Sequence, residues 1–588
     1  MPWHVDLAYD SYEEASEDFE WDVPADYNIA RDLLRKHENI DRTALYQAYP
    51  DGREETYSFA DLDRLSDRLA RGLRDLGVSR GDRVAVIVPQ KPENPLSHLA
   101  CWKLGAISLP LSVLFGEEGL RYRLDHSGSV VAVADASVRE TLASAREGCP
   151  ALEHVIEVGG PNADEAGDGR DESANDGDHD RDEVHAFEDV LAPAGSGDSE
   201  GNDEEGREGE RREDERFEIA DTDAETPALV LYTSGSTGPP KGALHTHGIW
   251  LGHCPGFRMY FEFTGRAVEG VFFTPADWAW IGGLGDVLFP AWHYGQPVVS
   301  YPMGKFDPER AYELMGRYDV THAFIPPTAI RMAMGVENPR ERYDLSLEAV
   351  SAGGEALTPE IAGWADDLDV AIDEFYGQTE ANLLVSNCGE WFSMRTGSMG
   401  KPVPGHEVAL IDESGEEVPT GEVGQVAVRH DADDPVVFAE YWREPETTAA
   451  ARVGEWHHTG DLASRDEDGY VWFKARADDV IVTSGYRVGP GEVEGAILEH
   501  PAVEQAGVIG VPDETRGEII KAFVQPVSDT DEIEGSDAAD ELRAEIEDLV
   551  REQLAKHEYP REIEFVEALP QTTTGKIRRT ELRERERT

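Results

Sequence analysis

The chain has 588 residues, of which 120 are acidic and 53 basic, so its formal net charge is −67. A chain of this length builds several hydrophobic cores and therefore two or more domains. Its negative charge repels nucleic acid and anionic membranes, which excludes binding to either as its principal function.

The composition also bears on the compartment. The four cysteines are widely spaced and include no Cys-x-x-Cys pair, which indicates neither a disulfide framework nor a zinc site. The N-terminus is acidic and lacks the basic and apolar regions of a signal segment. No run of 18 apolar residues is present. We therefore expect a cytoplasmic protein without a membrane span, and the sequence leaves its oligomeric state open.

Residues 1–150 have the pattern of an α/β domain. Apolar side chains recur every three or four positions over 59–76, which predicts a helix. Ser58 and Asp61 predict the cap at its start. Strand–helix–strand alternation then indicates a parallel sheet. The predicted strand, helix and strand lie at 84–88, 96–104 and 105–110.

An acidic segment over residues 160–216 interrupts this pattern. Residues 161–216 contain 22 acidic residues, six arginines and few large apolar side chains. Such a segment cannot bury enough apolar surface to become ordered. We expect a disordered insertion, and a segment that binds a partner protein is the alternative.

Residues 232–242 (YTSGSTGPPKG) are the most distinctive stretch. They follow an apolar run, 228–231, that predicts a buried strand. Three glycines permit unusual backbone angles, while serine and threonine hydroxyls and Lys241 supply donors and a positive charge. Such a loop can surround polyphosphate, although its spacing is not that of a Walker A loop. The alternative is a flexible glycine–serine linker, which the preceding strand and Pro239-Pro240 disfavour.

The remainder of the chain alternates strands and helices and then restarts as a compact segment. Predicted strands at 271–273 and 322–325 flank a helix at 308–318. Near residue 478 the pattern begins again, which suggests a C-terminal domain of about 110 residues. Its predicted helix, strand and second helix lie at 491–500, 506–511 and 538–554.

Five motifs occur in one order: YTSGSTGPPKG at 232–242, GGEA at 353–356, YGQTE at 376–380, TGD at 459–461, and residues 476–490 with TGK at 574–576. This set resembles the adenylate-forming (AMP-binding) superfamily, and the chain is most similar to its AMP-forming medium-chain acyl-CoA synthetases. The resemblance covers nearly the whole chain apart from the acidic insertion. It implies an α/β fold with two parts: a large N-terminal adenylation domain of layered parallel-type sheets and helices (1–477), and a small, mobile α+β lid domain (478–588).

The same resemblance implies the reaction acid + ATP + CoA → acyl-CoA + AMP + pyrophosphate, through a bound acyl-adenylate. ATP, Mg²⁺ and CoA would be the cofactor and co-substrates, and the partners would be small molecules. Fatty acid or lipid metabolism would be the setting.

The resemblance assigns residues around ATP. The β- and γ-phosphates would be cradled by Thr233, Ser234, Gly235, Ser236, Thr237, Gly238 and Lys241. Adenine would lie along Gly354, Glu355 and Ala356, and the nucleotide site would be lined by Glu374, Phe375, Tyr376, Gly377, Gln378 and Thr379. Thr379 would approach the α-phosphate and the acyl carboxylate. Glu380 would hold Mg²⁺, which prefers carboxylate oxygens; a surface glutamate is the alternative.

The ribose and the lid are assigned in the same way. Asp461 would accept both ribose hydroxyls, because an ionised carboxylate takes two donors. Arg476 and Arg487 would meet the ribose and phosphate groups, with surface ion pairing as the alternative. Lys576 would bridge the carboxylate and the α-phosphate while charge builds on the phosphoryl oxygens.

Asp478 matches the family's hinge, about which the lid would rotate and withdraw Lys576 after adenylation. Ala475 stands before Arg476 where the family usually has glycine, which would slightly stiffen the hinge. The rotated lid would present a channel for the pantetheine thiol through Ser484, Gly485 and Tyr486. The phosphates of CoA would meet Arg516, Arg551, Tyr559 and Arg561, since arginine suits phosphate oxygens.

The acyl pocket is where this sequence departs most from acetate-specific relatives. Where those narrow the pocket with Trp, Thr and Val, this chain has Gly377, Gly282 and Gly353. We expect a deep apolar slot, which Trp280, Ile281 and His247 could line, with a place in the core as the alternative for Trp280. It would favour medium-chain, branched or aryl acids.

Several alternatives stay open. One is an acetate or propionate CoA ligase, and a luciferase-like enzyme would share every motif. Adenylation for a thioester carrier is disfavoured, because no carrier domain follows Lys576 in this sequence. A non-catalytic acyl or nucleotide sensor would be favoured by loss of Lys241, Glu380, Asp461 or Lys576, and all four are present.

The net charge yields a prediction about salt. Because so acidic a chain repels itself unless salt screens it, we expect a protein adapted to a very salty cytoplasm. Its unfolding midpoint in urea should rise steadily as KCl is raised from about 0.1 M to about 2 M. Complete folding and full activity in dilute buffer would show that the hypothesis is wrong.

Overall fold

The structure is a computed structural model that describes residues 3–159, 183–192, 216–233, 239–355, 357–430, 434–483, 486–513, 516–527, 537–554, 559–571 and 576–587. The chain divides into two compact units. Unit 1 comprises Met1–Ser234, Pro240–Glu407 and Arg429–Glu455; unit 2 comprises Gly235–Pro239, Val408–Val428 and Trp456–Thr588. The predicted boundary at residue 478 falls inside unit 2, and a lid domain that begins there stays a prediction.

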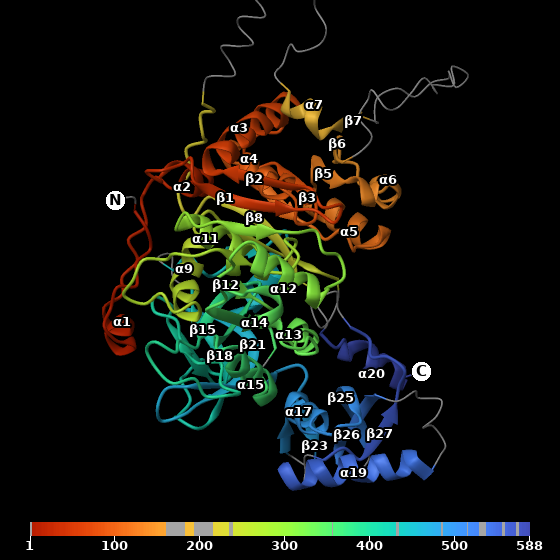
Figure 1. Ribbon diagram of the computed structural model, residues 1–588. Helices are drawn as coiled ribbons and strands as arrows, with labels where there is room; N and C mark the ends of the chain where they lie inside the picture. Colours follow the sequence, from red (N-terminus) through yellow and green to blue (C-terminus); the bar gives the residue numbers. More distant parts are fainter. Residues whose placement is uncertain are drawn as a thin grey trace, which may run out of the picture. The chain divides into compact units, whose positions relative to one another are not determined.

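Unit 1 contains two large sheets (Figure 1). The first is, in spatial order, β16 (Lys401–Pro402), β15 (Ala381–Ser386), β14 (Ala371–Gln378), β13 (Ala349–Gly353), β12 (His322–Phe324), β10 (Phe272–Phe273), β11 (Val298–Ser300), β1 (Thr43–Ala48) and β2 (Glu54–Ser58). The second is β19 (Glu440–Tyr441), β9 (Lys241–Thr246), β8 (Pro227–Thr233), β4 (Ile107–Pro110), β3 (Arg83–Ile87), β5 (Val131–Asp135), β6 (His154–Val158) and β7 (Glu183–Ala186). Both sheets are parallel in the middle and antiparallel at one or both edges.

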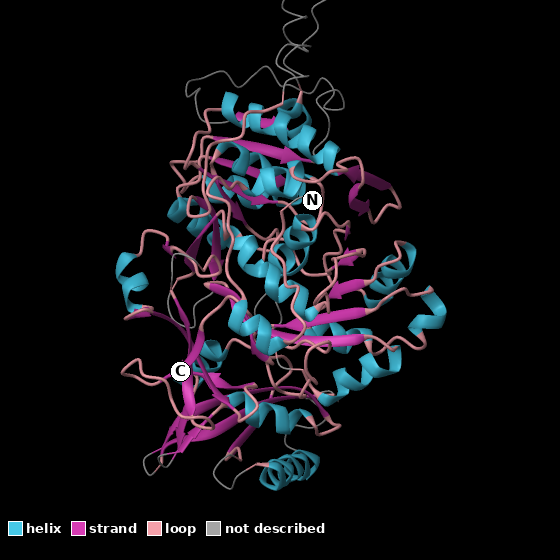
Figure 2. Cartoon of the chain, turned by 90° about the vertical axis from the view of Figure 1, so that its left-hand side faces the viewer, coloured by secondary structure: helices cyan, strands magenta, loops and turns pink. Residues whose placement is uncertain are grey.

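Helices cover the strands on both sides (Figure 2). One core cluster contains side chains of both sheets and of α2, α3, α4, α9 and α11, so these helices form a shared apolar layer. Two further clusters lie on the outer faces of the sheets, one with α12, α13 and α15 and one with α5 and α6. This is the layered α/β arrangement that the sequence predicted.

The described helices of unit 1 are α1 (Tyr12–Asp18), α2 (Ile29–Arg35), α3 (Phe59–Asp75), α4 (Glu93–Leu104), α5 (Glu117–Ser127), η1 (Ala136–Val138), α6 (Arg139–Arg146), α7 (Phe187–Leu191), α9 (Ile249–Tyr260), α10 (Ile281–Gly283), the π-helical turn η2 (Leu284–Leu288), α11 (Phe289–His293), α12 (Pro308–Arg317), α13 (Pro327–Ala333), α14 (Pro339–Tyr343), α15 (Pro359–Leu368) and α16 (Pro445–Ala450). The short strand β20 (Arg452–Val453) follows α16. No described helix is long and apolar enough to cross a membrane.

Local patterning specified the early elements well. Helix α3 buries Phe59, Leu62, Leu69 and Leu73 along one face, as the three- and four-residue spacing requires. Its predicted cap is confirmed as a capping box, in which the Ser58 hydroxyl accepts from the Asp61 amide and the Asp61 carboxylate accepts from the Ser58 amide. The predicted strand–helix–strand unit is confirmed as β3, α4 and β4.

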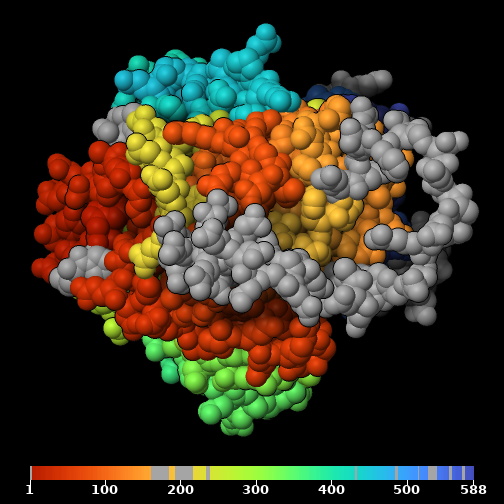
Figure 3. Space-filling model, turned by 90° about the horizontal axis from the view of Figure 1, so that it is seen from above, coloured from red at the N-terminus to blue at the C-terminus, as the bar shows by residue number. Residues whose placement is uncertain are grey.

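The acidic insertion is partly ordered, which corrects the expectation for residues 183–192. Here β7 pairs in parallel with β6, and α7 follows it. Phe187 is buried in the main core, and Val190 approaches Gly72 of α3. Apolar side chains therefore anchor this short stretch within acidic surroundings; Figure 3 shows this end of unit 1 from above, coloured red to gold along the sequence. The other residues of the insertion up to 215 lie outside the described ones.

Unit 2 contains two small sheets. In one, β17 (Val408–Ile411), β18 (Val423–Arg429), β21 (Trp456–Arg465) and β22 (Val471–Arg476) are successive neighbours. In the other, β24 (Tyr486–Val488), β23 (Ile481–Thr483), β26 (Gly517–Pro526) and β25 (Val503–Asp513) are joined by β27 (Glu562–Phe565), which pairs with β26. Its described helices are α17 (Pro490–Leu498), α19 (Asp537–Gln553) and α20 (Arg579–Arg587). Helices α17 and α19 pack on the second sheet, which confirms the predicted α+β character of the small C-terminal part.

A fully buried ammonium group joins α3 to α4. Lys103 Nζ lies 2.6 Å from a carboxylate oxygen of Asp63 and 2.6 Å from one of Asp67, and its side chain is 0% exposed. Arg35 pairs with the same two carboxylates at 2.9 and 2.7 Å. Removing one of these four side chains would therefore leave a buried charge without its full compensation.

Replacing the central cation should destabilise unit 1 strongly. Lys103→Met leaves two buried carboxylates with one cation, a change that typically costs about 3–5 kcal/mol. The midpoint of urea unfolding should fall accordingly. The matched control is Arg53→Met, which removes an exposed pair with Asp51 and should leave the midpoint unchanged. Equal midpoints for all three proteins would contradict the assignment.

Candidate active site

The glycine-rich loop connects two strands of unit 1. β8 and β9 are antiparallel, and their ladder ends where Thr233 pairs with Lys241. The loop therefore starts and finishes at one end of a two-stranded ladder, with Lys241 at its foot. The loop residues Ser234, Gly235, Ser236, Thr237 and Gly238 lie outside the described residues.

Lys241 lies in a junction with Glu380, and Tyr441 links the two. The Lys241 ammonium lies 5.1 Å from the centroid of the Tyr441 ring. The Tyr441 hydroxyl donates to Glu380 Oε1 at 2.7 Å, and Glu380 is only 7% exposed. Strand β19 brings Tyr441 here by pairing with β9. Glu380 is therefore an oriented, largely buried carboxylate beside the loop's cation, and not the surface glutamate of the alternative reading.

The turn that carries Thr379 is held against β9. Thr379 and Glu380 form the connection between the antiparallel strands β14 and β15. The buried imidazole of His245, on β9, is hydrogen-bonded to the backbone of Thr379, and burial lowers the His245 pKa to about 4. Neither His245 nor Tyr441 belongs to a motif, and sequence reasoning missed both because they meet the turn only through the sheet.

Other predicted nucleotide residues differ in where their side chains point. Phe375, Tyr376, Gly377 and Gln378 lie on β14, as does Glu374. The Glu374 carboxylate, however, is buried and accepts from the Leu357 amide at 3.0 Å. Its side chain is therefore held at Leu357, the residue that follows the predicted adenine segment.

The predicted adenine segment begins at a tight turn after β13. Gly354 has a φ of 87°, in the region that glycine adopts readily. The Glu355 carboxylate accepts from the Thr328 hydroxyl at 3.1 Å and pairs with Arg331 at 3.2 Å. These contacts fix the segment on α13. Ala356 lies outside the described residues.

The predicted ribose-binding residue belongs to unit 2. Asp461 and Arg476 are directly opposite each other on β21 and β22, with a carboxylate–guanidinium distance of 3.6 Å. Arg476 also pairs with the predicted hinge residue Asp478 at 3.1 Å. Burial lowers the Arg476 pKa, but the neighbouring carboxylates outweigh this and raise it overall. The structure thus brings two predicted carboxylates, Asp461 and Asp478, to the guanidinium of a third predicted residue, Arg476.

Lys576 lies just before the C-terminal helix of unit 2. It is exposed, and α20 begins three residues later at Arg579. Arg579 pairs with Glu494 at 2.6 Å, and Asp479 pairs with Arg583 at 2.8 Å. These ion pairs fix the first turns of α20 to α17 and to the segment after Asp478. Sequence reasoning treated this tail only as basic and missed its anchors.

The predicted CoA residues are partly assembled. The Tyr559 ring has the Arg551 guanidinium 4.0 Å from its centroid and that of Arg561 at 4.7 Å. Arg551 is also paired with Glu547. Arg516 lies instead at the start of β26, where its amide donates to Asp513. In the predicted pantetheine channel, Tyr486 lies on β24 with Arg487, while Ser484 and Gly485 fall outside the described residues.

The three pocket glycines form one group in unit 1. A Cβ on Gly282 would lie 3.1 Å from the Phe324 ring, and one on Gly353 would lie 2.6 Å from the Phe375 ring. The two rings are 5.5 Å apart. A Cβ on Gly377 would lie 2.4 Å from the Leu383 backbone nitrogen. Phe375 therefore fills the space beside Gly353 that the sequence suggested would be open.

The other predicted lining residues behave differently. Ile281 packs partly buried against the main core. The half-buried Trp280 ring makes an edge contact with Phe115 at 5.9 Å. His247 is committed elsewhere, because its Nδ1 accepts from the Ile29 amide at the start of α2. A place for His247 in the pocket stays a prediction.

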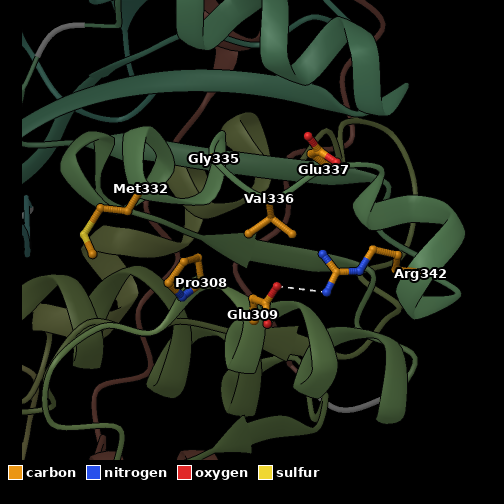
Figure 4. A pocket seen from close by; sticks show the side chains of 7 residues that line it. All are labelled: Pro308, Glu309, Met332, Gly335, Val336, Glu337 and Arg342. Carbon is orange, nitrogen blue, oxygen red and sulfur yellow. Dashed lines mark hydrogen bonds and ion pairs between the residues drawn. The ribbon is translucent and has the colours of Figure 1, made fainter.

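A surface pocket of about 480 Å³ lies elsewhere in unit 1 (Figure 4). The ion pair between Glu309 and Arg342, at 2.8 Å, closes one side of it. The pocket is lined by Pro308, Glu309, Met332, Gly335, Val336, Glu337 and Arg342, none of which is a predicted site residue.

Comparisons with known proteins agree with this geometry. A family model described as AMP-binding enzyme matches residues 34–442, and the model of the AMP-binding enzyme C-terminal domain matches residues 492–576. The chain is 33% identical to acyl-coenzyme A synthetase ACSM4, mitochondrial, of Mus musculus, over 96% of this chain and 91% of that one. It is 35% identical to acetyl-coenzyme A synthetase of Bacillus subtilis (strain 168), over 97% and 94%. The solved structure of the anthranilate CoA ligase AuaEII in complex with anthranoyl-AMP superposes with a TM-score of 0.79 at 28% identity, covering 97% of this chain and 99% of that one.

The buried Glu374 carboxyl predicts a pH dependence of stability. Burial raises its pKa from 4.5 to about 8, against the smaller opposite effect of the Leu357 amide. The folded chain therefore holds this proton where the unfolded chain has lost it, so folding is penalised progressively between about pH 5 and about pH 8. Glu374→Gln should remove this penalty. The difference between the unfolding midpoint of the variant and that of the natural chain should therefore rise in the variant's favour from about pH 5 to about pH 8. The control is the exposed Glu360→Gln; parallel midpoint curves for Glu374→Gln and the natural chain would refute the assignment.

Proposed function

Since the chain belongs to the AMP-binding enzyme family and is an AMP-forming acyl-CoA synthetase that uses ATP and CoA, we propose that it activates a medium-chain, branched or aryl carboxylic acid in preference to acetate. The observation that carries this proposal is the pair of aromatic rings beside two of the glycines, Phe324 next to Gly282 and Phe375 next to Gly353. Phe324 and Phe375 would bound the acyl group where relatives specific for acetate use bulkier residues at the glycine positions. An aromatic boundary suits an alkyl chain or an aryl ring.

We propose that the Lys241–Tyr441–Glu380 junction receives the polyphosphate of ATP with its Mg²⁺. A hard, oriented carboxylate oxygen is the ligand type that Mg²⁺ prefers, and Mg²⁺ is usually held by one or two carboxylates together with phosphates. The described residues contain no group of three or more potential metal ligands, which accords with that mode of binding. When bound, Mg²⁺ neutralises charge on the phosphates. Lys241 and the loop would orient the β- and γ-phosphates, and Thr379 would approach the α-phosphate.

Three residues of unit 2 complete the proposed chemistry. Asp461 would accept the ribose hydroxyls; its burial, with only 6% exposed, and its position opposite Arg476 support an oriented carboxylate. Lys576 would stabilise charge on the α-phosphate as pyrophosphate leaves. Asp478 would act as the hinge that later removes Lys576. The stack of Arg551, Tyr559 and Arg561 would contact the phosphates of CoA.

The proposal also covers the salt concentration, the compartment and the metabolism in which the enzyme works. The −67 charge supports work in concentrated salt, and we place the enzyme in the cytoplasm and in fatty acid metabolism. The alternative of an acetate or propionate CoA ligase is favoured by one observation, the 35% identity to a relative named acetyl-coenzyme A synthetase. A sensor without catalysis is disfavoured, because Lys241, Glu380, Asp461 and Lys576 are all present.

The acid preference is tested by AMP release in molar KCl with Mg-ATP and CoA. The acids are acetate, butyrate, 2-methylbutyrate, hexanoate, octanoate and benzoate. We expect the highest kcat/KM with butyrate or a larger acid, because each methylene buried in an apolar pocket gains about 0.8 kcal/mol. Acetate as the clear optimum would refute the proposed preference while leaving the reaction class intact.

A lysine substitution separates the two half-reactions. Lys576→Ala should reduce adenylation about a hundredfold or more, because one oriented charge on the transition state is lost. Thioester formation from supplied acyl-adenylate should persist near the natural rate. Arg578→Ala, which alters an exposed neighbour paired with Glu581, is the control and should affect neither step. Loss of both half-reactions in Lys576→Ala would contradict the alternation of the lid.

A further inference from the structure

A buried carboxyl group stands beside the three pocket glycines. Asp286 lies in the π-helical turn η2 and is 2% exposed. Its Oδ1 accepts from Asn382 Nδ2 at 2.7 Å, while Oδ2 has no hydrogen-bond partner among the described residues. Only one oxygen of the Asp286 carboxyl group is thus hydrogen-bonded, although buried carboxyl groups normally have both oxygens hydrogen-bonded.

The second carboxyl oxygen of Asp286 lies beside one pocket glycine, Gly282, and its partner Asn382 lies beside another, Gly377. A Cβ on Gly282 would lie 3.4 Å from Asp286 Oδ2, and one on Gly377 would lie 2.7 Å from Asn382 Oδ1. The Asp286–Asn382 pair therefore adjoins two of the three glycines, next to the Phe324 and Phe375 rings. Aromatic rings and polar side chains therefore both lie beside these glycines.

A neighbouring histidine adds a second unsatisfied group. His253 Nδ1 contacts the Gly285 carbonyl oxygen at 2.9 Å and lies 3.9 Å from Asp286 Oδ1, while His253 Nε2 is buried without a hydrogen-bond partner among the described residues. Burial lowers the His253 pKa to about 3 and raises that of Asp286 well above its ordinary value. Burial therefore disfavours the charged form of both side chains, and Asp286 Oδ2 can accept a hydrogen bond.

A purely structural role explains only half of this arrangement. Fixing Asn382 requires Oδ1 alone. Oδ2, beside Gly282, is therefore left to hydrogen-bond with a ligand group.

We propose that the substrate's acyl group carries a hydroxyl or amino substituent, and that Asp286 Oδ2 binds this substituent. The inference rests on the proposed function and specifies its substrate class as hydroxy- or amino-substituted carboxylic acids. Asp286 is then a specificity residue, and it takes no part in the transfer of the acyl group.

The test compares matched acids in ATP–pyrophosphate exchange in molar KCl, without CoA. The pairs are benzoate with 2-, 3- and 4-aminobenzoate and with the three hydroxybenzoates, and hexanoate with 6-hydroxyhexanoate. At least one substituted acid should exceed its parent tenfold or more in kcat/KM, because a site with a buried hydrogen-bonding group discriminates against an analogue that leaves it unpaired. Parent acids that equal or exceed every substituted partner would overturn the inference and leave the proposed function standing. No exchange with any acid would overturn both.

Two variants assign the preference to Asp286. In Asp286→Leu, the kcat/KM for a substituted acid divided by that for its parent acid should fall to about one or below, while activity with the parent acid persists. Asp286→Asn keeps the acceptor for Asn382 and replaces Oδ2 by an amide that only donates, so preference for an amino substituent should fall while that for a hydroxyl persists. This second variant preserves the test if the leucine variant fails to fold.

The matched control is Asp373→Asn, which alters another buried carboxyl group, on β14, that lies near Glu262 and Cys388. Its ratio of substituted to parent acid should equal that of the natural chain. Unchanged ratios in both Asp286 variants, or an equal change in Asp373→Asn, would show that Asp286 has only a structural role.

Discussion

The hydrogen bond from Tyr441 to Glu380 is the contact on which the phosphate end of unit 1 depends. It joins the edge strand β19 to the turn between β14 and β15, and thus links the two large sheets at one point. Lys241 lies against the same tyrosine ring, so the cation of the loop and the carboxylate of the turn are fixed by one side chain. His245 adds a second tie, from β9 to the backbone of Thr379. The strand ends on either side of the glycine-rich loop are therefore fixed by contacts with distant residues.

Some cations of this acidic chain compensate buried carboxylates. Lys103 and Arg35 compensate Asp63 and Asp67, while Lys36 and His293 surround Asp32, each at 2.7 Å. In unit 2, ion pairs of Arg579 with Glu494 and of Arg583 with Asp479 likewise fix α20. Only ten of the 53 basic residues are lysines. Arginine suits such sites, because its planar fork meets two carboxylates at once.

What the sequence could predict follows from the range of each interaction. Periodicity and capping are local, so α3, its cap and the β3–α4–β4 unit could be located from the residues alone. Lys241, Glu380, Asp461 and Lys576 were identified as candidates through the resemblance of five motifs to a known family, and each motif is a short stretch that can be recognised in the sequence. The Tyr441 link, the His245 tie and the anchors of α20 could not be predicted, since each joins residues far apart in sequence. The same holds for Phe375, whose ring occupies the space beside Gly353, and for β7, whose order depends on the edge of β6.

The most direct test of this account is the KM for Mg-ATP in acid-dependent ATP–pyrophosphate exchange, measured in molar KCl for the natural chain and for Tyr441→Phe. The variant keeps the ring beside Lys241 and removes only the hydrogen bond to Glu380. A hydrogen bond to a charged group is worth about 1.5–3 kcal/mol, so the account predicts a rise of about tenfold or more in the KM for Mg-ATP, with the KM for the acid nearly unchanged. An unchanged KM for Mg-ATP would contradict the claim that this junction receives the nucleotide.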